Sequence, residues 1–356
     1  MIMISVQRVA AVLLVSVLFT TAVACKKKVA GGAALADRSG LGAVPASADV
    51  VVSIDVAAVS SAPLVQQAAT KLLLRDTALA ARWDRLRTAC KLDPLAMKQV
   101  VLALGPARAA APAGSGAPMT AAPDAGKAVL MVVTGPLVEA DFASCVRAMV
   151  GGGGGALTAK TVAGRTIYQA KEGARSVWFG FGKADTVVLG STENFVTDAL
   201  SNGGKIGDNP EFTGWLGLIG GDAPLWAIGR VDPRVGEGII KATAGNVVAG
   251  PRAILLKADL KNGLNVELHV QMATASDATN LESFAKTQLG LLQMAAQWKN
   301  LGPLAAKLTT KLQGTSLQFR ADWTTDDLNQ LLSVIDSAAP DNETAPPSPA
   351  APSPGN

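Results

Sequence analysis

The side chains with the most distinctive chemistry in this sequence are three cysteines, Cys25, Cys90 and Cys145, and a single histidine, His269. A cysteine can carry a lipid, pair in a disulfide, attack a substrate as a thiolate or bind a metal. The sequence has no Cys-x-x-Cys pair, so the spacing indicates neither a redox-catalytic motif nor a zinc site. The role of each cysteine therefore has to be inferred from the residues around it.

The segment before Cys25 has the properties of an export signal. Residues 1–24 contain one ionisable side chain, Arg8, and are almost entirely apolar from residue 9 onward. A membrane-spanning helix needs about 20 apolar residues, and this run is shorter and ends in the small residues Ala22-Val23-Ala24. A basic start, a short apolar core and a small-residue end predict a cleavable signal peptide over residues 1–24.

The small residues lead directly into Cys25 and resemble the lipobox of bacterial lipoproteins, although leucine is commoner at the position of Ala22. The resemblance implies cleavage after Ala24, a diacylglyceryl group on the Cys25 sulfur and acylation of the new amine by a fatty acid such as palmitate. We therefore expect a lipid-anchored protein of the cell envelope that faces the periplasm. Lys26 is not the aspartate associated with inner-membrane retention in some bacteria, which favours the outer membrane. The alternatives are an ordinary signal peptide with a coincidental cysteine and an uncleaved N-terminal helix.

Three lysines, Lys26, Lys27 and Lys28, follow Cys25. Each can add about 1 kcal/mol of attraction to anionic head groups, or the three can form a simple solvated run. The sequence has 32 Lys and Arg against 28 Asp and Glu. Without Arg8 and these three lysines the balance is 28 against 28, and the remaining basic residues look scattered. The charge therefore predicts a membrane partner and no nucleic-acid partner.

With Cys25 assigned to lipid, Cys90 and Cys145 remain as a pair in an oxidising compartment. Both end or lie on apolar stripes with helical spacing, so both should point toward a core: Leu79, Trp83, Leu86 and Cys90 in one stripe, and Val138, Phe142, Cys145 and Met149 in the other. A disulfide between them would close a loop of roughly 55 residues, which the chain-entropy model values at about 4 kcal/mol. Two buried free thiols are the alternative.

Composition divides the chain into five parts. A flexible lipidated tether is expected over residues 25–47, and a disordered tail rich in Pro, Ala and Ser over residues 340–356. Between them we predict two α+β modules, at 48–205 and 206–339. The first module contains a disordered insertion at 106–126.

The pattern of strands and helices predicts the fold class. Asn262-Gly263 joins the clearest hairpin. Its two strands are predicted at 252–260 and 264–272, and other strands at 49–56, 99–104, 127–134, 161–169, 176–181, 186–190, 225–231 and 316–323. The two halves share their order of elements, and the alternating strands have one polar face. We therefore expect an α+β fold made of two diverged repeats of antiparallel sheet, with helices packed on one face.

Four short segments carry a second resemblance, namely residues 45–49 (PASAD), 90–95 (CKLDPL), Cys145 and 209–212 (NPEF). They resemble a group of uncharacterised predicted bacterial envelope lipoproteins. The resemblance covers most of the body, but its motifs are structural and imply no particular activity.

The remaining candidates for chemistry give little support to catalysis. Alternation places His269 on a polar strand face beside Glu267 and Gln271, where a lone histidine is usually a bland surface residue. No Gly-x-Ser-x-Gly elbow or nucleotide-binding loop is present, and the acidic pair Asp326-Asp327 suits a helix start. We therefore predict no catalytic, cofactor-binding or metal-binding residues.

The expected function is non-catalytic binding or structural support in the envelope, with a protein, lipid or cell-wall ligand. A lipid or lipoprotein carrier with an apolar cleft is the alternative, and a hydrolase with an unfamiliar site is a weaker one.

Overall fold

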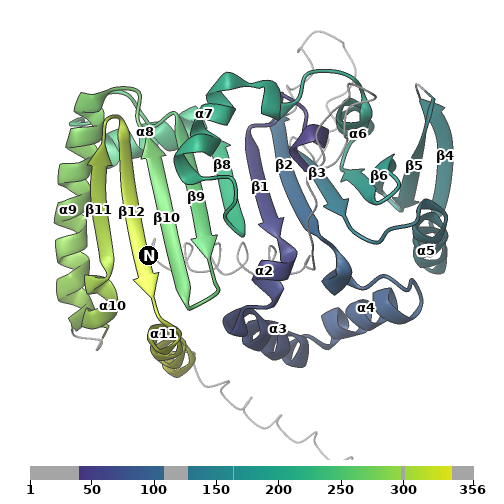
Figure 1. Ribbon diagram of the computed structural model, residues 1–356, viewed down its shortest axis with the longest axis horizontal. Helices are drawn as coiled ribbons and strands as arrows, with labels where there is room; N and C mark the ends of the chain where they lie inside the picture. The colour runs from purple at the N-terminus through teal and green to yellow at the C-terminus, as the bar shows by residue number, and fades with distance from the viewer. Residues whose placement is uncertain (1–39, 108–126, 163, 298–300, 339–356) are drawn as a thin grey trace, which may run out of the picture.

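A computed structural model describes residues 40–107, 127–162, 164–297 and 301–338 (Figure 1). The predicted signal peptide, Ala24, Cys25 and Lys26–Lys28 lie outside the described residues. So do residues 108–126 of the predicted insertion and the predicted tail at 340–356. No helix within the described ranges combines the length and apolar character needed to cross a membrane.

One twisted sheet of twelve strands runs through the whole body (Figure 1). Its order is β11-β12-β10-β9-β8-β1-β2-β3-β7-β6-β5-β4, and each pair of neighbours is antiparallel. The predicted antiparallel α+β class is therefore confirmed. The strands are β1 (Val50–Asp55), β2 (Gln99–Ala107), β3 (Lys127–Thr134), β4 (Ala156–Val162), β5 (Arg165–Glu172), β6 (Arg175–Lys183), β7 (Thr186–Gly190), β8 (Leu225–Arg230), β9 (Ala253–Asp259), β10 (Leu264–Gln271), β11 (Leu308–Gln313) and β12 (Ser316–Trp323).

The two halves of the sheet repeat one topology around the central pair β1 and β8. In each half three consecutive strands lie side by side, a helix follows, and the last strand of the half returns to pair with the third strand. These return pairs are β3 with β7 and β10 with β12. The intervening helices are α5 (Glu139–Gly152) and α9 (Ala275–Gln297), and the closing helices are α6 (Glu193–Leu200) and α11 (Thr325–Ala338).

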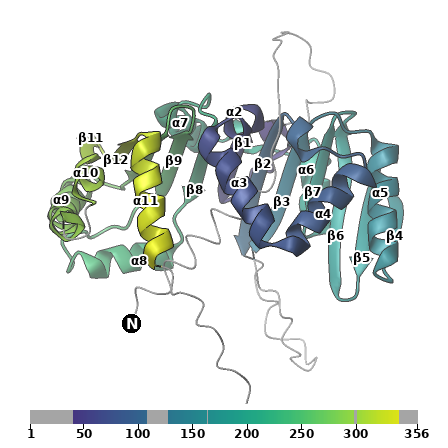
Figure 2. The same ribbon diagram turned by 90° about the horizontal axis from the view of Figure 1, so that it is seen from below.

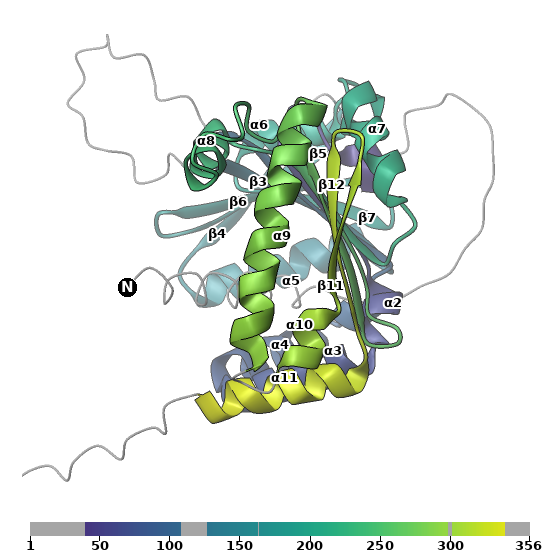
Figure 3. The same ribbon diagram turned by 90° about the vertical axis from the view of Figure 1, so that its left-hand side faces the viewer.

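The remaining helices lie in the connections between strands. The first and second strands of the first half are joined through α2 (Val56–Ser60), α3 (Pro63–Arg75) and α4 (Thr77–Thr88). The corresponding connection of the second half holds α8 (Pro233–Ala242). Two more helices, α7 (Pro210–Ile219) and α10 (Gly302–Ala306), precede β8 and β11. Figure 3 shows α9 standing alongside β11 and β12 at one end of the sheet.

The core of the first half lies on both faces of the sheet rather than under a single helical layer. Neighbouring strand residues alternate between two clusters, so Val101 and Val132 belong to one cluster and Val100 and Val133 to the other. Helix α6 adds Val196 to the first cluster, while α5 adds Ala143 to the second. The helices of this half therefore cover both faces, so the predicted packing of helices on one face was wrong for this half, because its strands are apolar on both faces. A third described cluster joins α9 to β10 and β12.

The folded body begins earlier than the sequence indicated. Residues 40–47 were expected to belong to the flexible tether, but Gly40–Ala43 form a 3-10 turn, η1. Ala43 and Val44 are fully buried, and Pro45 forms a bridge with Lys205. The predicted tether boundary at residue 47 was therefore wrong, because small residues that suggest a linker also fit a tightly packed turn.

Candidate functional site

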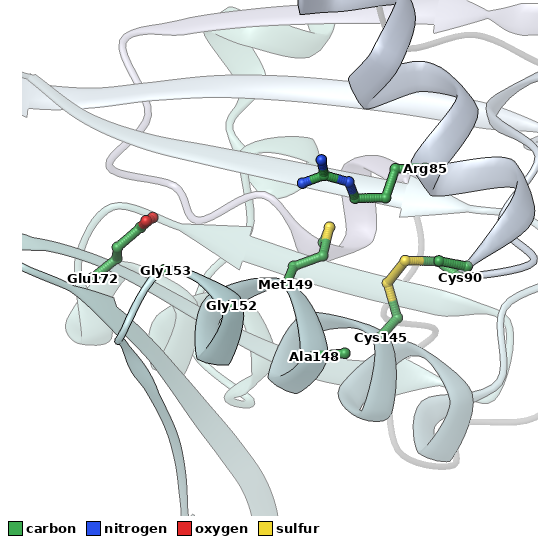
Figure 4. A pocket seen from close by; sticks show the side chains of 9 residues that line it. Arg85, Cys90, Cys145, Ala148, Met149, Gly152, Gly153 and Glu172 are labelled. Atoms are coloured by element: carbon green, nitrogen blue, oxygen red, sulfur yellow. A yellow bond between two sulfur atoms is a disulfide. The ribbon is translucent and has the colours of Figure 1, made fainter.

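An open groove lies between the end of α4 and helix α5 (Figure 4). Its volume is about 460 Å³. The residues that line it come from α4 and the segment after it, from α5 and the residue that follows it, and from the end of β5: Arg85, Ala89, Cys90, Cys145, Ala148, Met149, Gly152, Gly153 and Glu172.

Small residues give the groove its room. Ala148 and Gly152 lie on the exposed side of α5, where Met149 is 40% exposed. A Cβ atom on Gly153 would overlap the Glu172 carboxylate, so a larger residue there would move this side chain away from the end of α5. The glycine run at 151–155 allows β5 to approach α5 closely, because a Cβ atom on Gly155 would overlap the Lys171 carbonyl oxygen.

The two charged residues of the groove have opposite signs. Arg85 extends from α4 above Met149, and Glu172 lies beyond Gly152 and Gly153, at the opposite end of the groove from the disulfide (Figure 4). Both side chains belong to exposed residues. The groove therefore offers a cation, an anion and an apolar thioether to a ligand, without a cluster of titratable groups between them.

A disulfide forms one wall of the groove. Cys90 and Cys145 are bonded across a sequence separation of 55 residues, with their Cα atoms 5.0 Å apart. Both residues are only 6% exposed. The predicted pairing is confirmed, and neither sulfur is available as a thiolate nucleophile while the bond is intact.

A second polar cluster surrounds His269 in the other half of the sheet. His269 is paired with Leu255 on β9 and Gln318 on β12, and it is 7% exposed. Its Nδ1 atom lies 3.4 Å from the Ser316 hydroxyl, and its Nε2 atom lies 3.7 Å from the Glu267 carboxylate. The expectation of a surface histidine was wrong, because side chains on the neighbouring strands and the register of the sheet enclose the ring.

Glu267 is the centre of this cluster. Its carboxylate is 2.9 Å from the Lys257 ammonium and 3.6 Å from the Arg320 guanidinium, and it accepts a hydrogen bond of 3.0 Å from Gln318. Burial raises the pKa of Glu267, but Lys257 and Arg320 outweigh burial and hold this pKa below its usual value. Glu267 therefore balances two cations on the sheet.

Burial lowers the pKa of His269, and the Lys257 charge adds to that shift, while Glu267 opposes it. The net pKa lies below the usual value of 6.5, so the ring is neutral near pH 7. The contacts of His269 with Ser316 and Glu267 are longer than the roughly 2.6–3.2 Å of a nucleophile, base and orienting acid. This geometry describes a packed polar cluster better than a catalytic triad.

The other sequence candidates have structural roles in the described residues. Asp327 contacts Lys307 and accepts hydrogen bonds from the Thr324 backbone and hydroxyl at the start of α11, whereas Asp326 is exposed. No group of three or more His, Cys, Asp and Glu side chains within the described ranges is placed to hold a metal ion. Arg85 and Glu172 were not predicted as site residues. In the sequence, only the Cys90–Cys145 pairing could have indicated that the segments carrying them lie close together.

Comparison with known proteins gives no family. No family model matches this chain, and no curated protein matches its sequence. A solved structure, crystal form I of TP0453, superimposes over 83% of this chain and 96% of that chain, with a TM-score of 0.42 and 13% sequence identity. Similarity at this level carries no inference about function.

Proposed function

We propose that this chain is an envelope lipoprotein, anchored through acyl groups on Cys25, whose folded body binds a partner without catalysis. The observation that carries the binding role is the open groove between α4 and α5. The anchor rests on the lipobox-like residues 22–25, and Lys26 favours the outer membrane over the inner one.

The groove has the properties of a binding site. Its volume of about 460 Å³ lies within the usual range for ligand sites, roughly 300–1,000 Å³. Arg85 and Glu172 can fix the orientation of a polar partner, and Met149 can adapt to its apolar part. An open groove of this kind suits a segment of a protein or wall polymer better than an enclosed small molecule.

Site-specific photocrosslinking in intact cells tests the binding role. A photoreactive residue in place of Ala148 should form a defined adduct, and Arg85→Glu should abolish it. The matched control is the same probe at Val177 on β6, which is 45% exposed and outside the groove. Equal adducts at both positions, or none at Ala148, would refute the groove as the binding site. Mass analysis of the adduct distinguishes a protein from a wall component or a lipid.

The anchor requires a separate test, because the groove could bind its partner whether or not the chain is acylated. Cys25→Ala should abolish incorporation of labelled fatty acid and cause unprocessed precursor to accumulate. Lys26→Ala is the control, and it should keep both acylation and processing. Unchanged size and membrane retention of the Cys25→Ala protein would contradict the anchor.

One observation favours a lipid carrier as a second candidate. Five apolar side chains share a face of the β9–β10 hairpin, are only half-buried and belong to none of the described clusters: Ile254, Leu256, Leu264, Val266 and Leu268. A carrier that used this face would co-purify with stoichiometric lipid, and Leu256→Asp would remove that lipid. If the protein purified from native membranes contained no lipid, the carrier would be excluded and the groove-binding function would remain.

A further inference from the structure

The positive charge of the folded body is concentrated on one helical segment, although the basic residues look scattered along the sequence. Residues 71–91 contain six basic side chains and two acidic ones. Without Arg8 and Lys26–Lys28 the sequence has 28 basic and 28 acidic residues. Outside residues 71–91, 22 of these basic residues and 26 of the acidic ones remain. The segment is therefore strongly positive within a body that is otherwise slightly negative. We name it the basic helix pair, and its basic residues are Lys71, Arg75, Arg82, Arg85, Arg87 and Lys91.

All six basic residues are exposed. They belong to the last part of α3, to α4 and to the residue after Cys90. Figure 2 shows both helices on the outside of the molecule, in front of the strands of the first half. The charges therefore form a surface rather than an internal network.

Helix α4 is only loosely embedded in the body. It has no buried residue, and its apolar stripe of Leu79, Trp83 and Leu86 is half-buried. At 100° per residue, Arg82 lies on one side of this stripe and Arg87 on the other. The stripe continues to the buried Cys90, so it faces the body, and the arginines lie on either side of it at the solvent edge, from where long basic side chains can reach lipid head groups.

The end of α3 adds an apolar side chain to this surface. Leu74 is 77% exposed and lies between Lys71 and Arg75 in the last turns of the helix. An exposed leucine among cations weakens the case for an acidic protein as partner, because charge pairing alone gives no use for the leucine. It suits a lipid surface, which offers both anionic head groups and an apolar layer.

The disulfide fixes where this surface points. Cys90 lies two residues after the end of α4 and is bonded to Cys145 on α5, so the end of the helix pair cannot swing away from the body. The 14 residues between Cys25 and Gly40 can span at most about 50 Å, so an anchored body stays close to its membrane. This last step rests on the proposed lipid anchor.

We propose that the basic helix pair is a membrane-contact surface that binds anionic lipid head groups and orients the folded body on the bilayer. Arg82, Arg87 and Lys91 supply charge, and Leu74 enters the interface. The contact is electrostatic in origin, so it weakens as salt screens the charges.

Vesicle co-sedimentation tests this surface without the anchor. The probe protein is the chain from Lys26 to Asn356, which has no acylated cysteine and keeps every described element. It should bind vesicles of phosphatidylcholine mixed with phosphatidylglycerol, fail to bind phosphatidylcholine alone, and dissociate at high salt. A triple variant, Arg82→Gln, Arg87→Gln and Lys91→Gln, should bind the anionic vesicles at least about 10-fold more weakly. These three positions exclude Arg85, so loss of vesicle binding is separable from loss of the groove partner.

The matched control removes the same charge from another part of the surface, with Arg234→Gln, Lys241→Gln and Lys261→Gln, all at exposed positions. It should bind nearly as well as the unaltered chain, since it keeps the basic helix pair; Lys26–Lys28 are present in every variant and cannot cause a difference between them. Circular dichroism and intact Cys90–Cys145 peptides establish that both variants are folded. Equal binding by the two triple variants overturns the proposal, as does binding that ignores phosphatidylglycerol. Salt-sensitive binding to an acidic peptide without binding to vesicles would assign the surface to a protein partner instead.

Discussion

Cys90, two residues after the end of α4, is bonded to Cys145 in the middle of α5, and the two Cα atoms lie 5.0 Å apart. This bond joins the exposed α3–α4 connection to a helix that packs on β4 and β5. Because α4 has no buried residue, the disulfide, rather than a buried hydrophobic interface, holds this connection against the body. The groove and the basic helix pair both depend on it.

Removing this bond should destabilise the protein substantially. The double variant Cys90→Ala and Cys145→Ala frees a loop of about 55 residues in the unfolded chain, and we expect a loss of roughly 2–4 kcal/mol in the free energy of unfolding. Urea denaturation of the acyl-free chain measures this loss, and reduction of the unaltered chain should reproduce it. An unchanged urea midpoint in the double variant would mean that α4 is held by packing instead.

Stability should also depend on pH through His269, the single histidine of the sequence. Its pKa is lowered in the folded protein, chiefly by burial, so the unfolded chain binds the proton more readily. The free energy of unfolding should therefore fall as the pH drops from about 7 to below about 6.5, the usual histidine pKa.

Urea midpoints at a series of pH values test this expectation. His269→Gln keeps a polar group near Ser316 but cannot titrate, so its stability should be nearly flat between about pH 5.5 and 7. A variant with the same slope as the unaltered chain would show that another group causes the pH dependence.

The amino-acid pattern predicted the interior strands well. The boundaries of β3, β7 and β12 agree with the expected ones, because β3 and β7 are continuous apolar runs and β12 alternates, and each is bounded by polar or turn residues. The edge strands were harder. Residues 161–169 were expected to form one strand, but β4 and β5 form a hairpin there, and β11 was missed altogether.

The missed strands share a physical cause. Both β4 and β11 lie at an edge of the sheet, and neither contains a buried residue, so neither has the apolar alternation that marks a strand. Helix α8 was missed because Gly236 and Gly238 lower its helix propensity. The groove could not be predicted, since Arg85 and Glu172 are distant in sequence and line one groove only because of the disulfide and the sheet order.

The two glycines near α8 give a prediction about packing. A Cβ atom on Gly250 would lie 2.8 Å from the Cα atom of Gly236, so the loop before β9 crosses α8 at backbone contact. Gly250→Ala should therefore lower the free energy of unfolding by about 1–3 kcal/mol, because backbone has to shift.

Gly238 is the matched control, since it is exposed on the same helix and a Cβ atom there would contact nothing within 4 Å. Gly238→Ala should stabilise the protein by about 0.5–1 kcal/mol through helix propensity. Thermal unfolding of both variants measures the contrast. Equal effects of the two substitutions would contradict a close approach at Gly250.

Asp277 fastens the start of α9 to the segment after α8. Its carboxylate accepts hydrogen bonds of 2.7 Å from the Val248 backbone, 2.7 Å from the Thr274 hydroxyl and 3.4 Å from the Ala249 backbone. The Val248 and Thr274 hydrogen bonds hold the pKa of Asp277 below its usual 3.8 despite burial. The ionised form therefore stabilises the fold above about pH 4, and that contribution is lost as the pH falls through the lowered pKa.

Asp277→Ala should lower the free energy of unfolding by about 1–3 kcal/mol at pH 7, because it leaves three partly buried donors without this acceptor. Glu237→Ala, at an exposed position on α8, is the control and should change stability by less than about 0.5 kcal/mol. In urea titrations the gap between Asp277→Asn and the unaltered chain should narrow as the pH is lowered below about 4, since the Asp277 carboxyl becomes neutral as the pH falls through its lowered pKa. A gap that stays constant down to pH values where all carboxylates are protonated would show that shape, rather than charge, makes Asp277 necessary.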